Sequence, residues 1–586
     1  ESLAADLPMQ DYGDWIISPG IVDAHVHLNE PGQTEWEGFQ TGTKAAAAGG
    51  VTSLIDMPLN SLPVTTTVDA WRQKLNASLG KLFVDVGFHG GVIPGSQAAL
   101  QSLIQKKVCG IKAFLCHSGL DEFPGVGKVD LEQAASVLSD SQTVLLAHAE
   151  QTDAAEIPKV TDARSYQQYV ATRPPEFELA AIEMLIEFCR QFETPVHIVH
   201  LATARAIPMI EAAKADGLPL TVETCPHYLF FTAENIPDGA TEFKCAPPIR
   251  NEENRIELCK AVETGLIDTI GSDHSPCVPE LKALDTGDFQ KAWGGIAGLQ
   301  LSLPVCWTLG RAFDWSPALL AERMSSAPAE RFGLGRRKGR IEAGLDADFV
   351  IWNPDEEFEL TADQLFHKHK VTPYLGCRLS AVVKETFVRG KSVFSHGQVD
   401  GEPSGTLLLR DEKTSHRVSD HLNSLLEVDS QSIHSALQQC CAAESWISRM
   451  ISGGPFTSEA DLMARAESSW QGLEEADYLQ AFAAHPRIGD VNTLREKYAN
   501  TAKIAGGEQS RVDTASESVL TRLATANDEY FEKFGFIFIV CATGKSADEM
   551  LAILESRLKN DRTTEINNAA AEQLKITRIR LRKLET

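Results

Sequence analysis

The sequence lacks an excess of positive charge. It has 54 lysine and arginine residues against 81 aspartate and glutamate residues, which gives a net charge of −27. A chain this acidic is repelled by the phosphates of nucleic acids and by anionic membrane surfaces, so we expect neither as a partner. Small molecules are the better candidates for its ligands.

Long hydrophobic runs are missing as well. The chain has no stretch of eighteen apolar residues, and no basic segment followed by an apolar one that would form a signal peptide. We therefore expect no membrane association and a cytoplasmic location, in keeping with a C-terminus that is not a peroxisomal tripeptide. Because the chain begins with Glu1 rather than with methionine, we expect that an N-terminal piece precedes it.

Paired cysteines are the third absence. The twelve cysteines are scattered without the spacing of a zinc site, and only Cys440 and Cys441 are adjacent. This usage is typical of reduced, mostly buried thiols in a cytosolic compartment. We interpret each cysteine as a small core residue.

What is present is a long series of alternating elements. With 586 residues, of which 43% are hydrophobic and 23% charged, the chain is globular and too long for one core. Short β-like apolar runs alternate with helical stretches, at residues 20–28, 51–57, 82–88, 110–115, 143–148, 196–201, 219–224 and 267–272. An open doubly wound sheet would show the same alternation, but eight repeats over about 250 residues favour closure into a (β/α)8 TIM barrel.

The segments after the barrel predict further domains. Residues 341–352 and 382–393 read as turn-linked antiparallel strands, and after residue 418 apolar residues recur at three- and four-residue spacing. The fold class is therefore α/β followed by a separate all-α domain. We predict a β-sandwich remnant at 1–19, the barrel at 20–335, completion of the β-sandwich at 336–400, a polar linker at 401–417 and a helical domain at 418–586. The polar linker predicts that the two halves fold separately.

The stretch around which the chain is organised is 21–28, with His25 and His27 near the end of the first predicted strand. Period two along a strand puts both imidazoles on one face, where they would make two metal ligands already fixed relative to one another. Taken alone, the pair is as well explained by two histidines that flank a core valine. Polar residues on the other predicted strands must distinguish between these two explanations.

Polar residues interrupt four further predicted strands at their C-terminal ends, namely Lys112, His148, His200 and Asp273. Strand ends of a TIM barrel converge on its axis, where the active sites of this fold lie. A lysine is a poor metal ligand as an ammonium, but carbamylation by carbon dioxide turns it into a carboxylate that can bridge two cations. The other histidines are better explained as core or surface residues, although His227 lies close enough to the predicted mouth to contact a substrate.

Residues 15–395 resemble the cyclic amidohydrolases, and within them the allantoinases. The resemblance lies in residues 25–32, 34–39, 56–61, 244–250, 271–277 and 292–296. It implies that His25, His27, Lys112 and Asp273 hold one divalent ion and that Lys112, His148 and His200 hold the other, with zinc expected at both positions and carbamylated Lys112 as the bridge. The related dihydroorotases carry arginine where Asn29 stands, and its absence favours a neutral ureide ring over a carboxylate.

The reaction implied by this resemblance is hydrolysis of the hydantoin ring of (S)-allantoin to allantoate. Two cations that share a water lower its pKa toward neutrality, and Asp273 takes the proton and passes it to the leaving nitrogen. The residues placed to contact the substrate are Asn29, Asn60, Ser61, His227 and Ser275. Two alternatives stay open: another cyclic amidohydrolase, of hydantoinase or dihydroorotase type, and a non-enzymatic assembly protein on the same fold. The full set of six ligand types weighs against the second.

The helical half has its own resemblance, carried by His485-Pro486-Arg487-Ile488-Gly489-Asp490, Glu508-Gln509 and the basic helix around Arg580. In this order they resemble the decarboxylases of 2-oxo-4-hydroxy-4-carboxy-5-ureidoimidazoline (OHCU). The resemblance implies catalysis without a cofactor, with His485 as general acid, the catalytic Glu508 together with Gln509 on the substrate ring, and Arg580 on the substrate carboxylate.

One departure weakens the second resemblance, because Ala505 stands where the family usually has serine. A non-catalytic helical docking module is the alternative for this half. If both resemblances hold, the chain is a bifunctional enzyme whose partners are small-molecule ureides, and we expect a homo-oligomer, either a homodimer or a homotetramer.

Overall fold

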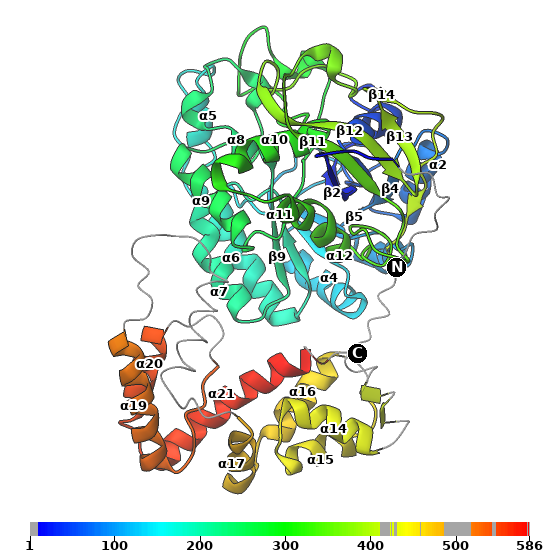
Figure 1. Cartoon of the computed structure of the whole chain (residues 1–586). Coiled ribbons are helices and arrows are strands. Elements are labelled where there is room, and N and C mark those ends of the chain that lie inside the picture. Colours follow the sequence, from blue (N-terminus) through cyan, green and yellow to red (C-terminus); the bar gives the residue numbers. More distant parts are fainter. Residues whose placement is uncertain are drawn as a thin grey trace. The chain divides into compact units, whose positions relative to one another are not determined.

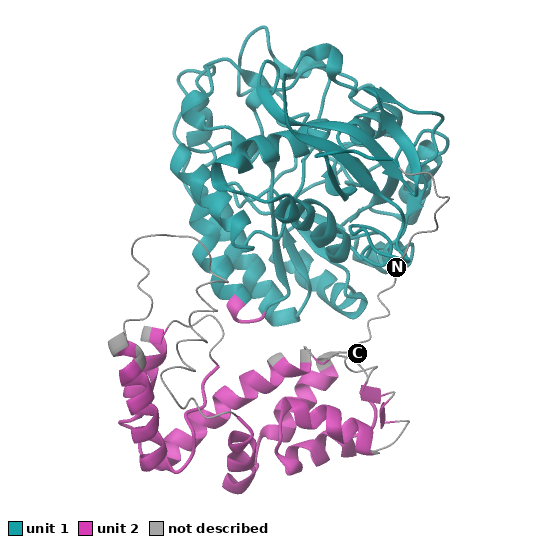
Figure 2. Ribbon diagram, viewed as in Figure 1, with its two compact units in different colours: residues 1–214, 218–412 teal, residues 215–217, 413–586 magenta. Residues whose placement is uncertain are grey.

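The computed structural model describes residues 10–410, 422–423, 425–426, 430–456, 459–485, 517–541, 547–582 and 584 (Figure 1). The chain divides into two compact units, residues 1–214 with 218–412 and residues 413–586 with 215–217 (Figure 2). Each unit has a hydrophobic core of its own. A search of the described helices finds none with the length and hydropathy needed to cross a membrane.

The first unit is built on a parallel barrel, as predicted. Its strands are β2 (Ile21–Val26), β3 (Val51–Asp56), β4 (Asp85–Phe88), β6 (Ile111–Phe114), β7 (Leu145–His148), β8 (Val196–Ile198), β9 (Leu220–Thr224) and β10 (Thr269–Ile270). All eight fall inside the predicted runs, and a short β5 (Gly90–Gly91) pairs with β6 in addition. The ring closes where the His27 amide donates to the His274 carbonyl at 2.9 Å, beside a parallel bridge between Val26 and His274.

Helices surround these strands (Figure 1). They include α1 (Phe39–Ala48), α2 (Val68–Ser78), α3 (Gln97–Ile104), α4 (Lys128–Ser141), α5 (Tyr166–Ala171), α6 (Pro175–Phe192), α7 (Ile207–Ala215), α8 (Pro226–Phe230), α9 (Glu252–Glu263), α10 (Ser302–Gly310), α11 (Pro317–Ala321) and α12 (Ala327–Arg331). Helix α6 shows why they form: proline opens its first turn, Glu176 and Glu178 complement the helix dipole there, and an apolar stripe that includes Ile182 and Leu185 is buried.

The small β domain is a five-stranded antiparallel sheet in the order β1 (Ile16–Pro19), β11 (Phe349–Glu359), β12 (Arg378–Val388), β13 (Lys391–Ser395) and β14 (Gln398–Val399). Strand β1 brings the start of the chain to the later segment, with Ile17 opposite Ile351. Buried Trp352 of β11 packs edge-on against Trp307 of α10, with ring centroids 5.0 Å apart. The sheet therefore shares its core with the barrel helices.

Residues 401–410 differ from the prediction, which assigned them to the linker. Strand β15 (Leu407–Leu408) pairs in parallel with β4, so that the chain returns to the barrel after the small sheet. The Gly405 amide donates to the Leu82 carbonyl at 2.8 Å, and Leu408 is buried in an apolar cluster with residues of several barrel strands. The segment looked like a linker because its apolar part is only three residues long, and its pairing partner is far away in the sequence.

This return strand predicts where the chain can be cut. Residues 1–400 expressed alone should unfold at a temperature roughly 5 °C or more below that of residues 1–412, because the shorter piece loses the β15 hydrogen bonds and the buried Leu408 side chain. Thermal unfolding followed by circular dichroism measures the difference.

Two neighbouring leucines give a matched control for this prediction. Leu408 is 1% exposed and Leu409 is 38% exposed. Leu408→Ala should cost about 2–5 kcal/mol of stability, whereas Leu409→Ala should have little effect. Equal unfolding temperatures for residues 1–400 and 1–412 would show that β15 adds nothing to the barrel.

The regular elements that the structure describes in the second unit are all helices. Its helices are α14 (Ser430–Cys440), α15 (Glu444–Ser452), α16 (Glu459–Trp470), α17 (Glu475–Ala483), α19 (Glu517–Phe534), α20 (Ala547–Arg557) and α21 (Arg562–Arg582). Helix α21 contacts α14, α16 and α17. The barrel, the small antiparallel sheet and the separate helical region together confirm the predicted fold class.

Candidate metal centre and active sites

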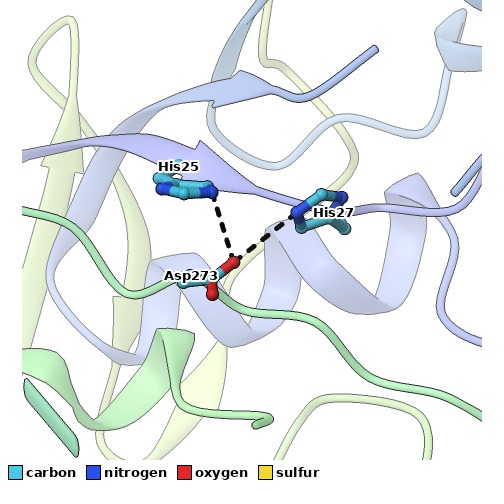
Figure 3. A group of neighbouring side chains, drawn as sticks. All are labelled: His25, His27 and Asp273. Atoms are coloured by element: carbon cyan, nitrogen blue, oxygen red, sulfur yellow. Dashed lines mark ion pairs between the residues drawn. The ribbon is translucent and has the colours of Figure 1, made fainter. Parts of the chain in front are cut away.

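Two strands of the barrel bring three of the predicted ligands together. His25 and His27 project from the end of β2 toward Asp273, which follows β10 (Figure 3). Oδ1 of Asp273 lies 3.2 Å from Nε2 of His25 and 3.5 Å from Nε2 of His27. Two imidazole nitrogens and one carboxylate oxygen thus face a common point, which is the donor set of a divalent metal site.

The other three predicted ligands lie beside this group. The rings of His148 and His200 are 4.5 Å apart between centroids, and those of His25 and His200 are 5.4 Å apart. Lys112 of β6 lies with Nζ 5.0 Å from the Phe114 ring, which stacks on His148. All six side chains line a single cavity of about 840 Å³. The structure thus brings together every ligand predicted for the barrel.

The electrostatics of the cavity suit metal binding. Burial lowers the pKa values of His27, His148 and His200, which keeps their imidazoles neutral and able to donate a lone pair. Burial alone would raise the pKa of Asp273, but the adjacent His25 and the other histidines hold it well below its usual range. Neutral imidazoles around an ionised carboxylate are the protonation states that a cation requires.

Lys112 is the unusual member of the cavity. It is fully buried, and its Nζ has no hydrogen-bond partner among the residues that the structure describes. Burial lowers the pKa of its ammonium to about 8, against the attraction of Asp273. A buried ammonium without a partner is costly, so its position here calls for a chemical change or for a ligand.

The substrate contacts predicted from the sequence are only partly assembled. Asn60 and Ser275 line the cavity, and Ser275 donates its hydroxyl to Oδ1 of Asp273 at 2.9 Å. Asn29, Ser61 and His227 are buried in the described barrel but do not belong to the lining of the cavity. Asn29 instead donates its amide to the Asn60 carbonyl at 3.0 Å.

Several cavity residues escaped prediction. Phe114, Tyr169, Arg173, Lys244, Phe289 and Trp293 all line the cavity. Tyr169 of α5 stacks on Phe289 of a later loop at an interplanar angle of 11°, so two segments far apart in sequence form one aromatic wall. No periodicity marks such residues. The signal that could have pointed to them is the density of aromatic and basic side chains in the loops after the strands.

The backbone is strained at the same place. Four non-glycine residues in or next to the cavity have left-handed backbone angles: Asn29 (φ 60°), Asn60 (φ 57°), His200 (φ 42°) and Asp273 (φ 44°). Such conformations cost on the order of 1–3 kcal/mol each and cluster at functional sites, where the surrounding packing enforces them. Two of the four are predicted metal ligands.

In the helical unit, the structure places His485 just after α17 and Arg580 on α21. Burial lowers the pKa of His485, and the nearby positive charge of Arg580 lowers it further. Gln573 and Thr577, two turns and one turn before Arg580 on the same helix, are buried polar residues that hydrogen-bond each other at 3.3 Å. Glu508, Gln509 and Ala505 lie outside the described residues.

Comparison with known proteins assigns a family to each of the two units. The amidohydrolase family model matches residues 16–393, and the chain belongs to this family, which generally binds divalent metal ions. The OHCU decarboxylase family model matches residues 427–582. The barrel half and the helical half are thus two enzyme domains of different families on one chain.

Individual proteins similar to this chain narrow the comparison further than the family models do. The allantoinase of Streptomyces avermitilis is 45% identical over 403 residues, which cover 69% of this chain and 89% of that protein. The allantoinase of Saccharomyces cerevisiae is 45% identical, over 67% of this chain and 86% of its own length, and the mitochondrial allantoinase of Aquarana catesbeiana is 48% identical, over 58% and 70%. Among solved structures, the L-hydantoinase from Arthrobacter aurescens superposes with a TM-score of 0.63 at 29% identity, covering 68% of this chain and 89% of that one.

Proposed function

We propose that the barrel unit hydrolyses the hydantoin ring of (S)-allantoin to allantoate, and that the helical unit decarboxylates OHCU to (S)-allantoin. The observation that carries the first half is the convergence of His25, His27, Lys112, His148, His200 and Asp273 on one cavity, in a chain 45% identical to allantoinases. The second half is supported by the family match and by the nearness of His485 and Arg580. The two reactions would be consecutive, because the product of one is the substrate of the other.

The metal centre that we propose has two zinc ions. His25, His27 and Asp273 fit one ion, His148 and His200 fit the other, and Lys112 carbamate would bridge them. Zinc suits a hydrolytic site of imidazole and carboxylate ligands. Nζ of Lys112 has no hydrogen-bond partner among the described residues, which supports this proposal, because a carbamate would replace a buried cation by an anion that could hold both metals. When bound, the ions would supply an activated water and polarise the ring carbonyl.

Asp273 is the proposed proton carrier of the hydrolysis. Its carboxylate faces the cavity between the two histidines of β2, and its low pKa leaves it ionised and able to accept a proton from the attacking water. Delivered to the ring nitrogen, the same proton would let the amide bond break with a neutral amine as leaving group. The hydroxyl of Ser275 holds Oδ1 of Asp273 in place for this transfer.

The cavity favours a neutral ureide. Asn29 occupies the position at which dihydroorotases have arginine, and it points its amide at the backbone of Asn60 rather than at the cavity. Arg173, the guanidinium on the cavity wall, is paired with Glu150 and so is not available to a substrate carboxylate. Turnover of allantoin in preference to hydantoin and dihydroorotate, measured with the same protein, would test this specificity against the other cyclic amidohydrolases.

In the helical unit we propose that Arg580 binds the carboxylate of OHCU and that His485 delivers a proton. The carbon–carboxylate bond breaks, carbon dioxide leaves, and the bonding electrons move into the adjacent imine. A proton from His485 then completes allantoin without a cofactor. Glu508 and Gln509 remain proposed contacts to the ring.

His485→Ala should reduce release of carbon dioxide from OHCU by at least on the order of a hundredfold, because the general acid is removed. Hydrolysis of supplied allantoin should be unchanged, since the barrel has a core of its own. Both rates are measured on the intact chain.

His434→Ala is the matched control for this prediction, because His434 belongs to the same unit and pairs with Glu444 at the surface. It should leave both rates intact. Persistent decarboxylation in His485→Ala would make the helical unit a docking module. We further propose a homodimer or homotetramer in the cytoplasm, which size-exclusion chromatography and cell fractionation would test.

A further inference from the structure

We propose that Glu150 and Glu223 are positioning residues, each of which fixes one histidine ligand by a hydrogen bond to the ring nitrogen that faces away from the metal. The inference rests on the proposed metal centre and goes beyond it, since neither glutamate is among the six ligands. Both carboxylates are buried in the barrel, at 0% and 1% exposure.

Glu223 of β9 holds His25. Its Oε1 lies 2.6 Å from Nδ1 of the imidazole, whose Nε2 points at Asp273. A carboxylate accepts a hydrogen bond, so the ring proton must lie on Nδ1, and Nε2 keeps its lone pair for a cation. The carboxylate sits tightly in place: a Cβ added to Gly271 would come within 2.4 Å of Oε2 of Glu223. Glycine is therefore required beside it.

Glu150 holds His148 through the opposite nitrogen. Its Oε2 lies 2.7 Å from Nε2 of the imidazole, so Nδ1 is the nitrogen offered to the metal. Arg173 fixes the carboxylate in turn, with Nε donating to Oε1 at 3.0 Å and Nη2 donating to Oε2. This guanidinium supplies the charge that keeps a fully buried glutamate ionised.

The two carboxylates are divided between the two proposed ions. Glu223 hydrogen-bonds His25, which belongs to the ion proposed at His25 and His27. Glu150 hydrogen-bonds His148, which belongs to the ion proposed at His148 and His200. Among the described residues, the partner of Nδ1 of His27 is the side-chain amide of Asn60, at 3.2 Å. Because a carboxylate partner orients the imidazole and raises its basicity, each ion has one strengthened histidine. The loss of either glutamate should therefore weaken one ion more than the other.

The test is zinc affinity of the full-length chain, measured by competition with a chelator. The unaltered protein should bind two ions, and Glu150→Gln and Glu223→Gln should each weaken one of the two by about 10–100-fold, the cost typical of losing such a partner. Glutamine keeps the shape of the side chain and removes its charge. The two variants report on different ions, so each checks the other if one fails to fold.

Glu178→Gln is the matched control. Glu178 is a buried glutamate paired with Arg250 at 2.5 Å, like Glu150 with Arg173, but it binds the backbone amides of Ala202 and Thr203 rather than a ligand histidine. It should lose stability and keep both zinc affinities. Unchanged affinity in both test variants, or an equal loss in Glu178→Gln, would overturn the inference. Absence of zinc from the unaltered protein would instead overturn the metal centre itself.

Discussion

Replacing Asp273 with asparagine is expected to lower allantoin hydrolysis by on the order of a hundredfold or more while part of the metal remains bound. Asparagine keeps an oxygen that can coordinate a cation, but its amide cannot take up a proton. The histidines that hold the pKa of Asp273 low would remain in place, so the site would keep its shape and lose its proton carrier. Steady-state kinetics and elemental analysis of the same preparation separate the two effects.

The control is Asp268→Asn. Asp268 immediately precedes β10, pairs with Lys214 at 2.6 Å and is not among the cavity residues. Its replacement should leave turnover of allantoin close to that of the unaltered protein. Near-normal turnover in Asp273→Asn would assign the proton transfer to another group, whereas complete loss of metal would show that Asp273 serves mainly as a ligand.

The second large effect is expected from Lys112→Ala. In the proposed centre, loss of the bridging group would deprive the two ions of a shared ligand, so both metal content and hydrolysis should fall to a small fraction of their normal values. Added short carboxylic acids should restore part of both, because they can take the place of the carbamate in the space that the side chain vacates. Full metal and full hydrolysis without such acids would contradict the carbamate.

Lys338→Ala serves as the buried-lysine control. Lys338 lies far from the cavity in sequence and contacts, with Nζ 2.7 Å from Asp85 and 2.6 Å from Asp348. Its removal leaves Asp348 without this cation and Asp85 with Arg389 alone, which should cost stability. It should not cost metal, and carboxylic acids should not rescue it.

The carbamate also predicts a pH dependence. Only the neutral amine reacts with carbon dioxide, and burial lowers the pKa of Lys112 from its ordinary value to about 8. About a tenth of Lys112 would then be neutral at pH 7, compared with well under a thousandth of an ordinary lysine, and the neutral fraction rises as the pH rises through 8. At a fixed concentration of dissolved carbon dioxide, reactivation of metal-free protein by zinc should therefore be faster at pH 9 than at pH 7.

The strands and the ligands could be read from the sequence because both are local. An apolar run such as 51–57 predicts a buried parallel strand by itself. A histidine or lysine at the end of such a run can be identified without knowing which residues surround it in space. The topology rule that strand ends meet at one face of a barrel then brings His25, Lys112 and Asp273 together. For these residues, pattern and fold rule were sufficient.

The partners of the ligands depended on the tertiary structure. Glu223 stands near the end of the 219–224 run and Glu150 in a loop, and no sequence pattern relates them to particular imidazoles. Asn29 was predicted to contact the substrate because it follows the two histidines, yet its left-handed backbone turns its amide toward Asn60. Side-chain direction at the end of a strand depends on local backbone angles that an apolar pattern does not encode.

The return strand β15 is another feature that the tertiary structure shows and the sequence pattern does not. A run as short as Leu407–Leu408 does not predict a strand. It pairs with β4, which lies more than three hundred residues earlier in the chain. The sequence by itself determined the barrel, the six candidate ligands at its strand ends and the presence of a second domain, because burial and period leave a local record along the chain. Tertiary structure alone decided which groups orient those ligands, which residues form the cavity wall and where the first unit ends, because each depends on contacts between segments with no shared pattern.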